Sequence, residues 1–310
     1  MSASSLADGV YTVVPTPFAA DGTLDVRSFT RLMEFLAGCG VEGMLVLGVL
    51  GEAPKLVPDE RRAIVEASVA AAGGRRVVVG VTHPSVVGTR GLAAAAEAAG
   101  AHAVLIAPPR VERAAGDEAI VDYFARSTEG LTVEVVLQDH PASSGVPLAV
   151  ELIARIVDAA PAVRSIKLED PPTPFKVSRV REEIPELKVF GGLGGVFFLE
   201  ELRHGANGTM TGFAFPEVLV EVFRAHAAGE RDRSAELFDR CLPLIRFEFQ
   251  EAIGLAVRKH VYVARGLIDD AHVRAPTAAL DPASVEDLHD LLARLDLARS
   301  SIGGPARGAP

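Results

Sequence analysis

Short apolar runs and longer amphipathic segments alternate along almost the whole chain. The short runs are rich in Val, Ile and Leu and end at Gly, Pro or Asp, a pattern that predicts buried β-strands. The segments between them carry apolar residues three and four positions apart, a pattern that predicts helices. The runs predict strands over residues 9–18, 43–48, 76–82, 103–109, 134–141, 165–170, 188–194 and 208–212.

The number and order of these units indicate the fold class. Eight alternating strand–helix units are what a closed parallel barrel with an outer ring of helices requires. We therefore expect an α/β protein with a (β/α)8 TIM barrel over residues 1–225. A helical extension packed on the barrel is expected over 226–298, and a flexible Gly- and Pro-rich tail over 299–310. A doubly wound sheet is the second choice, because it usually has fewer strands and a glycine-rich first turn.

The sixth predicted strand, "SIKLED" (165–170), places a lysine where a buried strand should be apolar. Alternation puts Lys167 and Glu169 on one face, and Ile166 and Leu168 on the face that packs under the helices. Inside a barrel, desolvation would lower the pKa of Lys167, and a neutral amine can attack a carbonyl carbon to form a Schiff base. Alternation alone equally allows Lys167 to lie at the wet end of the strand, paired with the acidic residues that follow it.

Four short motifs follow one another on the predicted strands. They are PTPF (15–18), GVLGE (48–52), QDHPASSG (138–145) and IKLE (166–169). In this order and spacing the chain, from about residue 9 to 230, resembles the dihydrodipicolinate synthase and N-acetylneuraminate lyase family of Schiff-base barrels. In that family the strand-six lysine forms an imine with pyruvate or another 2-oxo acid. The resemblance therefore implies this role for Lys167.

The loop after the second strand departs from the family pattern. The family usually has Gly-Thr-Thr-Gly-Glu here, and the loop binds the carboxylate of the 2-oxo acid. This chain has Gly48, Val49 and Leu50 at the first three positions, so both hydroxyl groups are missing. Backbone N–H groups of a tight turn can still bind a carboxylate, so we expect these three residues to contact the substrate. The alternative is that the turn is only apolar structure.

The end of the fifth strand departs as well. The family usually has Tyr-Asn-x-Pro there, with the tyrosine relaying protons above the imine. Gln138 takes the tyrosine position in this chain, and an amide can orient water or a hydroxyl group but cannot transfer a proton. His140 follows on the same face and titrates near neutrality, so it is the preferred general acid/base. A buried structural histidine is the alternative for His140, and His83 is a weaker catalytic candidate.

The residues expected around the substrate point away from dihydrodipicolinate synthesis itself. Ser143 takes the place of the arginine that those synthases use for the distal carboxylate of their aldehyde substrate. The segment instead resembles the branch that includes 2-keto-3-deoxy sugar-acid dehydratases. We therefore expect a lyase that dehydrates or cleaves a 2-oxo acid through an imine on Lys167. Gly192 and Met210, at the ends of the seventh and eighth strands, are also expected to contact the substrate.

Two other functions remain open. The Gly-rich segments 191–195 and 208–212 lie where many barrels bind phosphate, which allows a phosphosugar isomerase or aldolase. In the sequence, Lys188 and Arg203 are the only basic residues near these turns, so room for the substrate is the preferred explanation. The loss of the family's hydroxyl groups also allows a catalytically inactive homologue that only binds a 2-oxo acid.

Composition narrows the partners and the compartment. The net charge of −10 and the absence of a basic run argue against nucleic acid or an anionic membrane as a partner. Two cysteines and eight scattered histidines give no disulfide framework or metal-ligand spacing, so neither a metal nor another cofactor is expected. The N-terminus lacks the pattern of a signal peptide, which favours the cytoplasm. The family resemblance implies a homo-oligomer, either a tetramer or a dimer.

Overall fold

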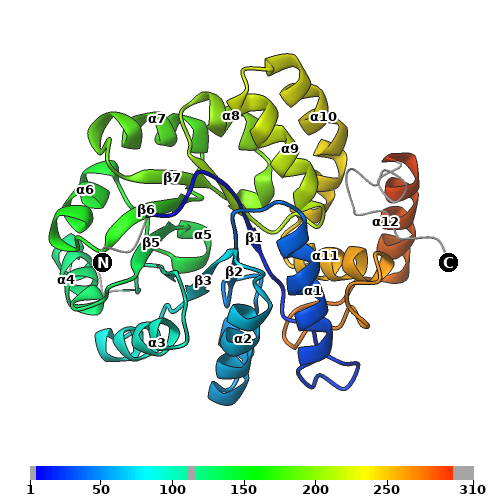
Figure 1. Cartoon of the computed structure of the whole chain (residues 1–310), viewed down its shortest axis with the longest axis horizontal. Coiled ribbons are helices and arrows are strands. Elements are labelled where there is room, and N and C mark those ends of the chain that lie inside the picture. Colours follow the sequence, from blue (N-terminus) through cyan, green and yellow to red (C-terminus); the bar gives the residue numbers. More distant parts are fainter. Residues whose placement is uncertain (1–4, 111–115, 296–310) are drawn as a thin grey trace.

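The structure, a computed structural model, describes residues 5–110 and 116–295. Its centre is a closed barrel in which each strand pairs in parallel with the next and β8 pairs with β1 (Figure 1). All eight predicted strands are confirmed. Their bounds are β1 Gly9–Val13, β2 Gly43–Val46, β3 Arg76–Gly80, β4 Ala103–Ile106, β5 Glu134–Asp139, β6 Val163–Leu168, β7 Lys188–Gly191 and β8 Gly208–Thr211.

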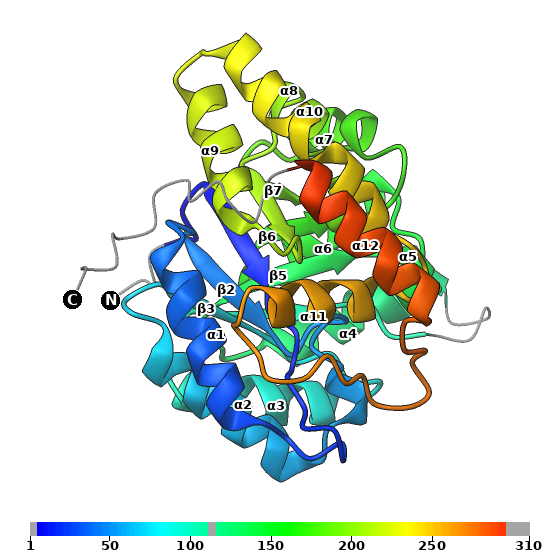
Figure 2. The ribbon, with the colours of Figure 1, turned by 90° about the vertical axis from the view of Figure 1, so that its right-hand side faces the viewer.

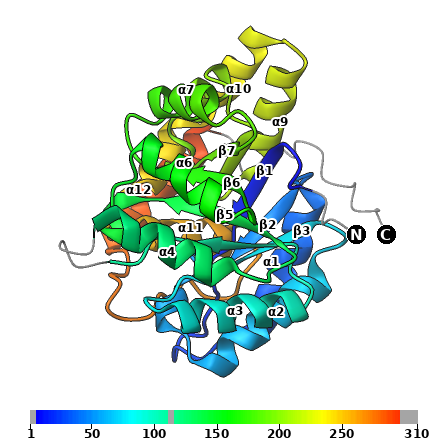
Figure 3. The same cartoon turned by 90° about the vertical axis from the view of Figure 1, so that its left-hand side faces the viewer.

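Helices surround the barrel, so the fold is the expected (β/α)8 TIM barrel. Figure 3 shows α3, α4, α6 and α7 as neighbours on one side. The helices up to the end of the eighth unit are α1 Val26–Gly38, α2 Pro58–Ala71, α3 Val86–Ala98, α4 Gly116–Thr128, α5 Pro141–Ser144, α6 Val150–Ala159, α7 Thr173–Glu183, α8 Phe198–Arg203 and α9 Pro216–Ala227. Two short 3₁₀ turns, η1 Ala53–Lys55 and η3 Leu193–Gly195, follow β2 and β7.

Local sequence explains where several helices begin. The carboxylate of Asp25 accepts a hydrogen bond from the N–H of Ser28, at 2.9 Å, and caps α1. The hydroxyl of Ser85 does the same for α3 through the N–H of Gly88, at 3.1 Å. Helix α2 begins at Pro58, where the missing N–H of proline costs nothing.

The two faces of the strands build two separate apolar cores. The larger core lies between the barrel and the helices and contains Ile166 and Leu168. The smaller core fills the barrel interior and consists of Leu6, Tyr11, Val13, Leu45, Val78, Ala103, Leu105, Val136, Phe190 and Met210. The alternation predicted for the sixth strand is therefore present, and Lys167 lies on the inner face.

A polar cluster at the amino ends of the strands closes the floor of the barrel. Glu134, at the start of β5, is 1% exposed. Its carboxylate accepts hydrogen bonds from the backbone N–H of Leu6, at 2.9 Å, and from the hydroxyl of Ser165. Nearby, the ammonium of Lys188 contacts Asp8 at 2.8 Å and the carbonyl of Leu6 at 2.7 Å. The chain segment before β1 is therefore anchored across the floor.

Up to residue 295, where the described part of the chain ends, three further helices follow the barrel. They are α10 Arg231–Glu248, α11 Gly254–Ala264 and α12 Pro282–Leu295, and α12 lies against α10 and α11 (Figure 2). The predicted boundary at residues 225/226 falls in the last turn of α9, and the predicted tail 299–310 lies outside the described residues. In the described ranges, no helix combines the length and the apolar character needed to cross a bilayer.

Candidate active site

Lys167 lies inside the barrel, near the carboxyl end of β6. In the strand register it is flanked by Gln138 of β5 and Phe190 of β7. The residue is 6% exposed, and its Nζ lies 3.1 Å from Oε2 of Glu169. The sequence allowed either a lysine inside the barrel or a lysine paired with an acidic residue at the solvent-exposed end of the strand. The structure combines the two, because Lys167 is paired with Glu169 and the pair is buried. The structure supplies a counter-ion for a buried ammonium at this position.

Glu169 is the centre of the polar cluster. It is 7% exposed, and its Oε2 accepts a hydrogen bond from Nε2 of Gln138 at 2.9 Å. Its Oε1 accepts a hydrogen bond from the N–H of Leu193 at 3.2 Å. Burial would raise the pKa of Glu169, but the charge of Lys167 and the hydrogen bond from Gln138 outweigh it and hold the pKa below its ordinary value. Glu169 is therefore an ionised carboxylate beside the amine.

Gly192 makes room for this carboxylate. A Cβ at Gly192 would collide with Cγ of Glu169. The predicted substrate-binding glycine therefore lies in the same cluster as Lys167, and the absence of its side chain sets the position of Glu169. Its proposed contact with the substrate stays a prediction.

His140 lies at the start of α5, directly after β5. Burial lowers its pKa, and the charge of Lys167 acts in the same direction, while Glu169 opposes both. Its Nδ1 is buried and has no hydrogen-bond partner within residues 5–110 and 116–295. A neutral imidazole near the Lys167–Glu169 pair is compatible with the predicted role. His83 instead bonds to Ser85 at the start of α3 through its own Nδ1.

The GVLGE loop forms a compact turn after β2. The N–H of Gly51 donates to the carbonyl of Gly48 at 3.0 Å, and the N–H of Glu52 donates to the carbonyl of Val49 at 3.2 Å. The hydroxyl of Thr16, in the PTPF motif, donates to the carbonyl of Gly51 at 2.7 Å. The N–H groups of Val49 and Leu50 bond to no acceptor in the described part of the chain. Two backbone donors are therefore available on this turn.

The remaining predicted substrate-binding residues differ in exposure. Met210 is fully buried in the barrel interior, and Leu50 is half-buried against the same core. Val49 is 52% exposed. Ser143 is exposed on α5, and its hydroxyl donates to the carbonyl of His140 at 3.2 Å. The structure brings Gln138, Lys167 and Gly192 around Glu169, whereas the hydroxyl of Ser143 bonds to the backbone of His140.

A basic residue from the C-terminal extension reaches the glycine-rich turns, which the sequence analysis missed. The guanidinium of Arg258, on α11, lies within 3.5 Å of the positions that a Cβ on Gly194 or Gly212 would take. The expectation that no basic residue other than Lys188 and Arg203 lies near these turns is therefore wrong for the folded chain. Arg258 is paired with the buried carboxylate of Glu248, Nε to Oε2 at 3.2 Å, so its charge is already compensated.

Another buried glutamate lies in the wall behind the site. Glu201, on α8, is 0% exposed and presses against the backbone of Gly191 at the end of β7. Its Oε1 accepts a hydrogen bond from the hydroxyl of Thr173 at 2.6 Å, and its Oε2 has no partner among the residues described. Burial raises the pKa of Glu201 to about 8, while the Thr173 bond opposes this. Glu201 is a neutral acid at pH 7.

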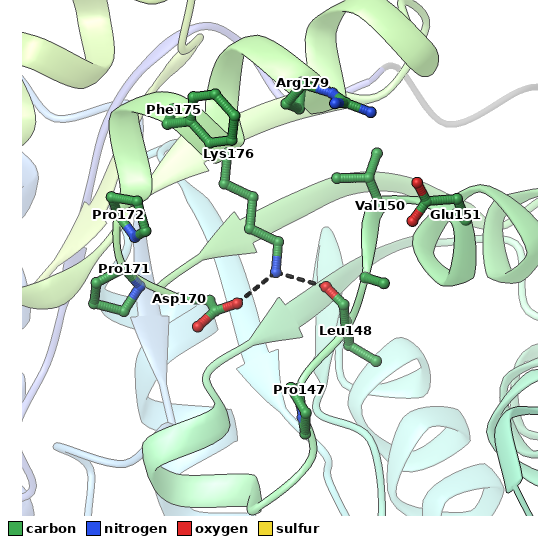
Figure 4. A pocket seen from close by; sticks show the side chains of 11 residues that line it. Pro147, Leu148, Val150, Glu151, Asp170, Pro171, Pro172, Phe175, Lys176 and Arg179 are labelled. Atoms are coloured by element: carbon green, nitrogen blue, oxygen red, sulfur yellow. Dashed lines mark hydrogen bonds and ion pairs between the residues drawn. The ribbon is translucent and has the colours of Figure 1, made fainter.

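A hollow on the molecule lies outside the barrel wall, away from Lys167. It has a volume of about 450 Å³ between α6 and α7 and is lined by Pro147, Leu148, Ala149, Val150, Glu151, Asp170, Pro171, Pro172, Phe175, Lys176 and Arg179 (Figure 4). The ammonium of Lys176 points to Asp170, at 2.8 Å, and to the carbonyl of Leu148, at 2.6 Å. It also lies 2.7 Å from the fully buried Asp139. With these partners, the Lys176 ammonium is held by two carboxylates and a backbone carbonyl.

The described residues contain no cluster of three or more His, Cys, Asp or Glu side chains arranged to bind a metal. The polar groups at the carboxyl ends of the strands are instead one amine, one carboxylate, one amide and one imidazole. This set can form an imine and move protons beside it.

A TIM barrel with a buried lysine on β6 and a backbone donor turn after β2 is the arrangement of a Schiff-base barrel. Residues 6–295 match the model of the dihydrodipicolinate synthetase family. This chain belongs to that family.

Relatives in the family have different names. The L-2-keto-3-deoxyarabonate dehydratase of Azospirillum brasilense is 29% identical, over 93% of this chain and 94% of that protein. A 4-hydroxy-tetrahydrodipicolinate synthase of Streptomyces coelicolor is also 29% identical, over 94% and 95%. The crystal structure of a dihydrodipicolinate synthase from Rhodopseudomonas palustris has a TM-score of 0.89 and 40% identity, over 93% and 97%. YagE from E. coli K12, in complex with pyruvate, has a TM-score of 0.87 and 25% identity, over 94% and 100%.

Proposed function

We propose that this protein is a lyase that forms a Schiff base between Lys167 and C2 of a 2-oxo acid. The observation that carries the proposal is the buried Lys167–Glu169 pair, 3.1 Å apart inside the barrel. The pyruvate complex of YagE supports a 2-oxo acid as the ligand class. The free N–H groups of Val49 and Leu50 support carboxylate binding at the loop after β2.

Glu169 can carry the protons of imine formation. It takes one proton from the Lys167 ammonium, which leaves a neutral amine to attack C2 of the substrate. The resulting carbinolamine loses its hydroxyl group as water when the Glu169 carboxylic acid returns a proton to it. The products are an iminium on Lys167 and a Glu169 carboxylate, so atoms and charge balance.

We favour dehydration of a 2-keto-3-deoxy sugar acid as the following reaction. The Glu169 carboxylate removes a proton from C3, next to the iminium, and an enamine forms. The enamine expels the C4 hydroxyl group, which leaves as water after Glu169 returns the proton. Gln138 supports Glu169 through its amide and adds no proton of its own. The dehydratase relative from Azospirillum supports this branch, and aldol cleavage shares every step up to the iminium.

The experiment is borohydride trapping on the full-length protein. The protein is incubated with pyruvate and, separately, with a panel of keto-deoxy sugar acids, and is then reduced and digested for mass spectrometry. We expect a stable adduct on the peptide that contains Lys167. A parallel assay for released pyruvate, aldehyde or dehydrated product separates cleavage from dehydration.

Two outcomes would change the proposal. Binding of the 2-oxo acid without an adduct would favour an inactive binding homologue. Competition by inorganic phosphate would favour the phosphosugar alternative, although the pairing of Arg258 with Glu248 argues against a free cation at the glycine-rich turns. A homo-oligomer in the cytoplasm is also proposed here, and light scattering on the purified protein distinguishes a dimer from a tetramer.

A further inference from the structure

The GVLGE loop ends at a glutamate whose backbone is in the left-handed region. Glu52 has φ 53° and is 2% exposed. A residue with a side chain pays free energy for this conformation and keeps it only where the surroundings determine it. The partners of the Glu52 side chain are therefore informative about what fixes the loop.

Three donors from outside the loop's own turn hold the Glu52 carboxylate. Its Oε1 lies 2.7 Å from Nζ of Lys259, on α11. Its Oε2 lies 2.8 Å from Nζ of Lys55 and accepts a hydrogen bond from the backbone N–H of Arg274 at 3.1 Å. Two of these three donors belong to the C-terminal extension, which is remote from the loop in the sequence.

Lys259 is the most deeply buried of these donors. It is 0% exposed, its ammonium donates to the carbonyl of His272 at 2.6 Å, and it lies 4.6 Å from the centre of the Phe18 ring. Burial lowers the pKa of Lys259 to about 8, and the Glu52 carboxylate opposes the shift. Phe18 ends the PTPF motif, so one ammonium connects the first-strand motif, the GVLGE loop and the extension.

The position of Glu52 determines the geometry of the donor turn. The N–H of Glu52 closes the turn on the carbonyl of Val49 at 3.2 Å. Leu50 packs directly on Gly212 at the end of β8, where a Cβ would collide with it. A rotation at Glu52 would therefore reorient the peptide groups whose N–H donors are free, those of Val49 and Leu50.

We propose that Lys259 is a positioning residue for the substrate carboxylate, acting through Glu52 on the backbone donors of the GVLGE loop. The C-terminal extension then contributes to substrate recognition without touching the substrate. This inference rests on the proposed Schiff-base function, because it needs a 2-oxo acid in the barrel.

The test compares two ketones in Lys259→Met. Pyruvate carries the carboxylate that the loop would bind, whereas hydroxyacetone has a ketone and no carboxylate. The measurement is the ratio of the borohydride-trapping efficiencies of the two ketones, each as the initial rate divided by concentration. Misplaced donors in catalytic sites cost up to about 100-fold, and we expect the ratio to fall by at least about 10-fold. A general loss of folded protein would lower both rates and leave the ratio unchanged.

Lys188→Met is the matched control. The Lys188 ammonium also contacts one carboxylate, at 2.8 Å, and one backbone carbonyl, at 2.7 Å, but at the floor of the barrel. We expect its ratio to equal that of the wild type. Lys259→Arg keeps the charge and should restore part of the ratio.

Lys55→Met tests the same inference if Lys259→Met does not fold. Lys55 contacts the same carboxylate from a more exposed position, with 20% of its side chain exposed, and its loss should lower the ratio in the same direction by a smaller factor. A wild-type ratio in Lys55→Met and in every Lys259 variant that folds would overturn this inference alone. A wild-type protein that forms no adduct with either ketone would instead overturn the proposed function.

Discussion

The two ends of the barrel each contain a buried glutamate, and the two differ in what surrounds them. Glu134, at the floor, accepts from the backbone N–H of Leu6 and the hydroxyl of Ser165. Glu169, at the mouth, faces the ammonium of Lys167 at 3.1 Å. Both are less than 10% exposed, so burial does not distinguish them. The two glutamates differ in the kind of group that donates a hydrogen bond to each carboxylate.

The donors at the floor are neutral groups fixed by the fold, and they cannot give up a proton near pH 7. The donor at the mouth is a titratable amine that can also act as a nucleophile. We therefore propose that the buried carboxylate has a structural role at the floor and a chemical role at the mouth. Three substitutions test this difference, and a fourth, at the buried Glu201, extends it to a carboxyl group with no charged partner; they follow from the largest expected effect to the smallest.

Lys167→Ala should abolish the borohydride adduct and reduce turnover by roughly 10⁴-fold or more, because the nucleophile is lost. Mass spectrometry of the trapped protein and initial-rate kinetics are the measurements. Lys188→Ala, at the floor, serves as the control and should keep both. An adduct that persists in Lys167→Ala would place the imine on another lysine.

Glu169→Gln should lower kcat by about 10²–10⁴-fold, because the amide cannot exchange protons with the imine or the leaving hydroxyl group. Gln is close to Glu in shape but leaves the buried Lys167 ammonium without its counter-ion, so the unfolding transition should fall. The rates are therefore normalised to the amount of folded protein. His140→Ala is the comparison variant, and we expect the smaller loss there. Normal turnover in Glu169→Gln, together with a large loss in His140→Ala, would return the acid/base role to His140.

Glu201→Gln should remove a pH dependence of stability. The carboxyl group ionises near its ordinary value of 4.5 in the unfolded chain and near 8 in the folded protein. The stability that the neutral acid contributes is fully present below pH 4.5 and is lost as the pH rises through 8. At pH 9 the variant should be more stable than the wild type by roughly 4 kcal/mol, and at pH 5 the two should be similar.

Urea unfolding at pH 5 and pH 9 measures this difference. Glu66→Gln, on the exposed face of α2, is the control for the loss of one carboxylate. Equal pH profiles for the wild type and Glu201→Gln would mean that Glu201 is ionised in the folded protein.

Glu134→Gln should reduce the free energy of unfolding by about 1–3 kcal/mol, because one buried hydrogen bond at the floor is lost or weakened. Kinetic constants should stay at the wild-type values. A fall in kcat that exceeds the loss of folded protein would show that the floor is coupled to the mouth, and it would remove the contrast between the two glutamates.

The strands and the inner position of Lys167 could be predicted from the sequence for a physical reason. Parallel strands buried on both faces are apolar runs bounded by turn residues, and these signals are local. Alternation is equally local, so it placed Lys167 and Glu169 on the same face. The family resemblance then supplied the role of Lys167, which alternation alone left open.

The contacts that complete the site are not local, and the sequence pattern did not show them. Arg258 and Lys259 reach the glycine-rich turns and the GVLGE loop from α11, and only the folded chain brings these segments together. A role for Glu169 in the site could have been predicted from the sequence, because alternation already placed it on the same face as Lys167. What could not be inferred is that Gly192 and Gln138 would hold its carboxylate against the amine.

The pairing of β1 with β8 has a consequence for biosynthesis. Gly9 of the first strand lies opposite Gly208 of the last. One edge of β1 therefore cannot form its hydrogen bonds until β8 has been synthesised, when about two thirds of the polypeptide has been made. At roughly 5–20 residues per second, this interval is on the order of ten seconds or more. During it the nascent chain displays an unpaired, apolar strand edge, a known starting point for aggregation. A faster rate of translation shortens this interval, so it should increase the yield of soluble recombinant protein. Co-production of chaperones that bind extended segments should have the same effect.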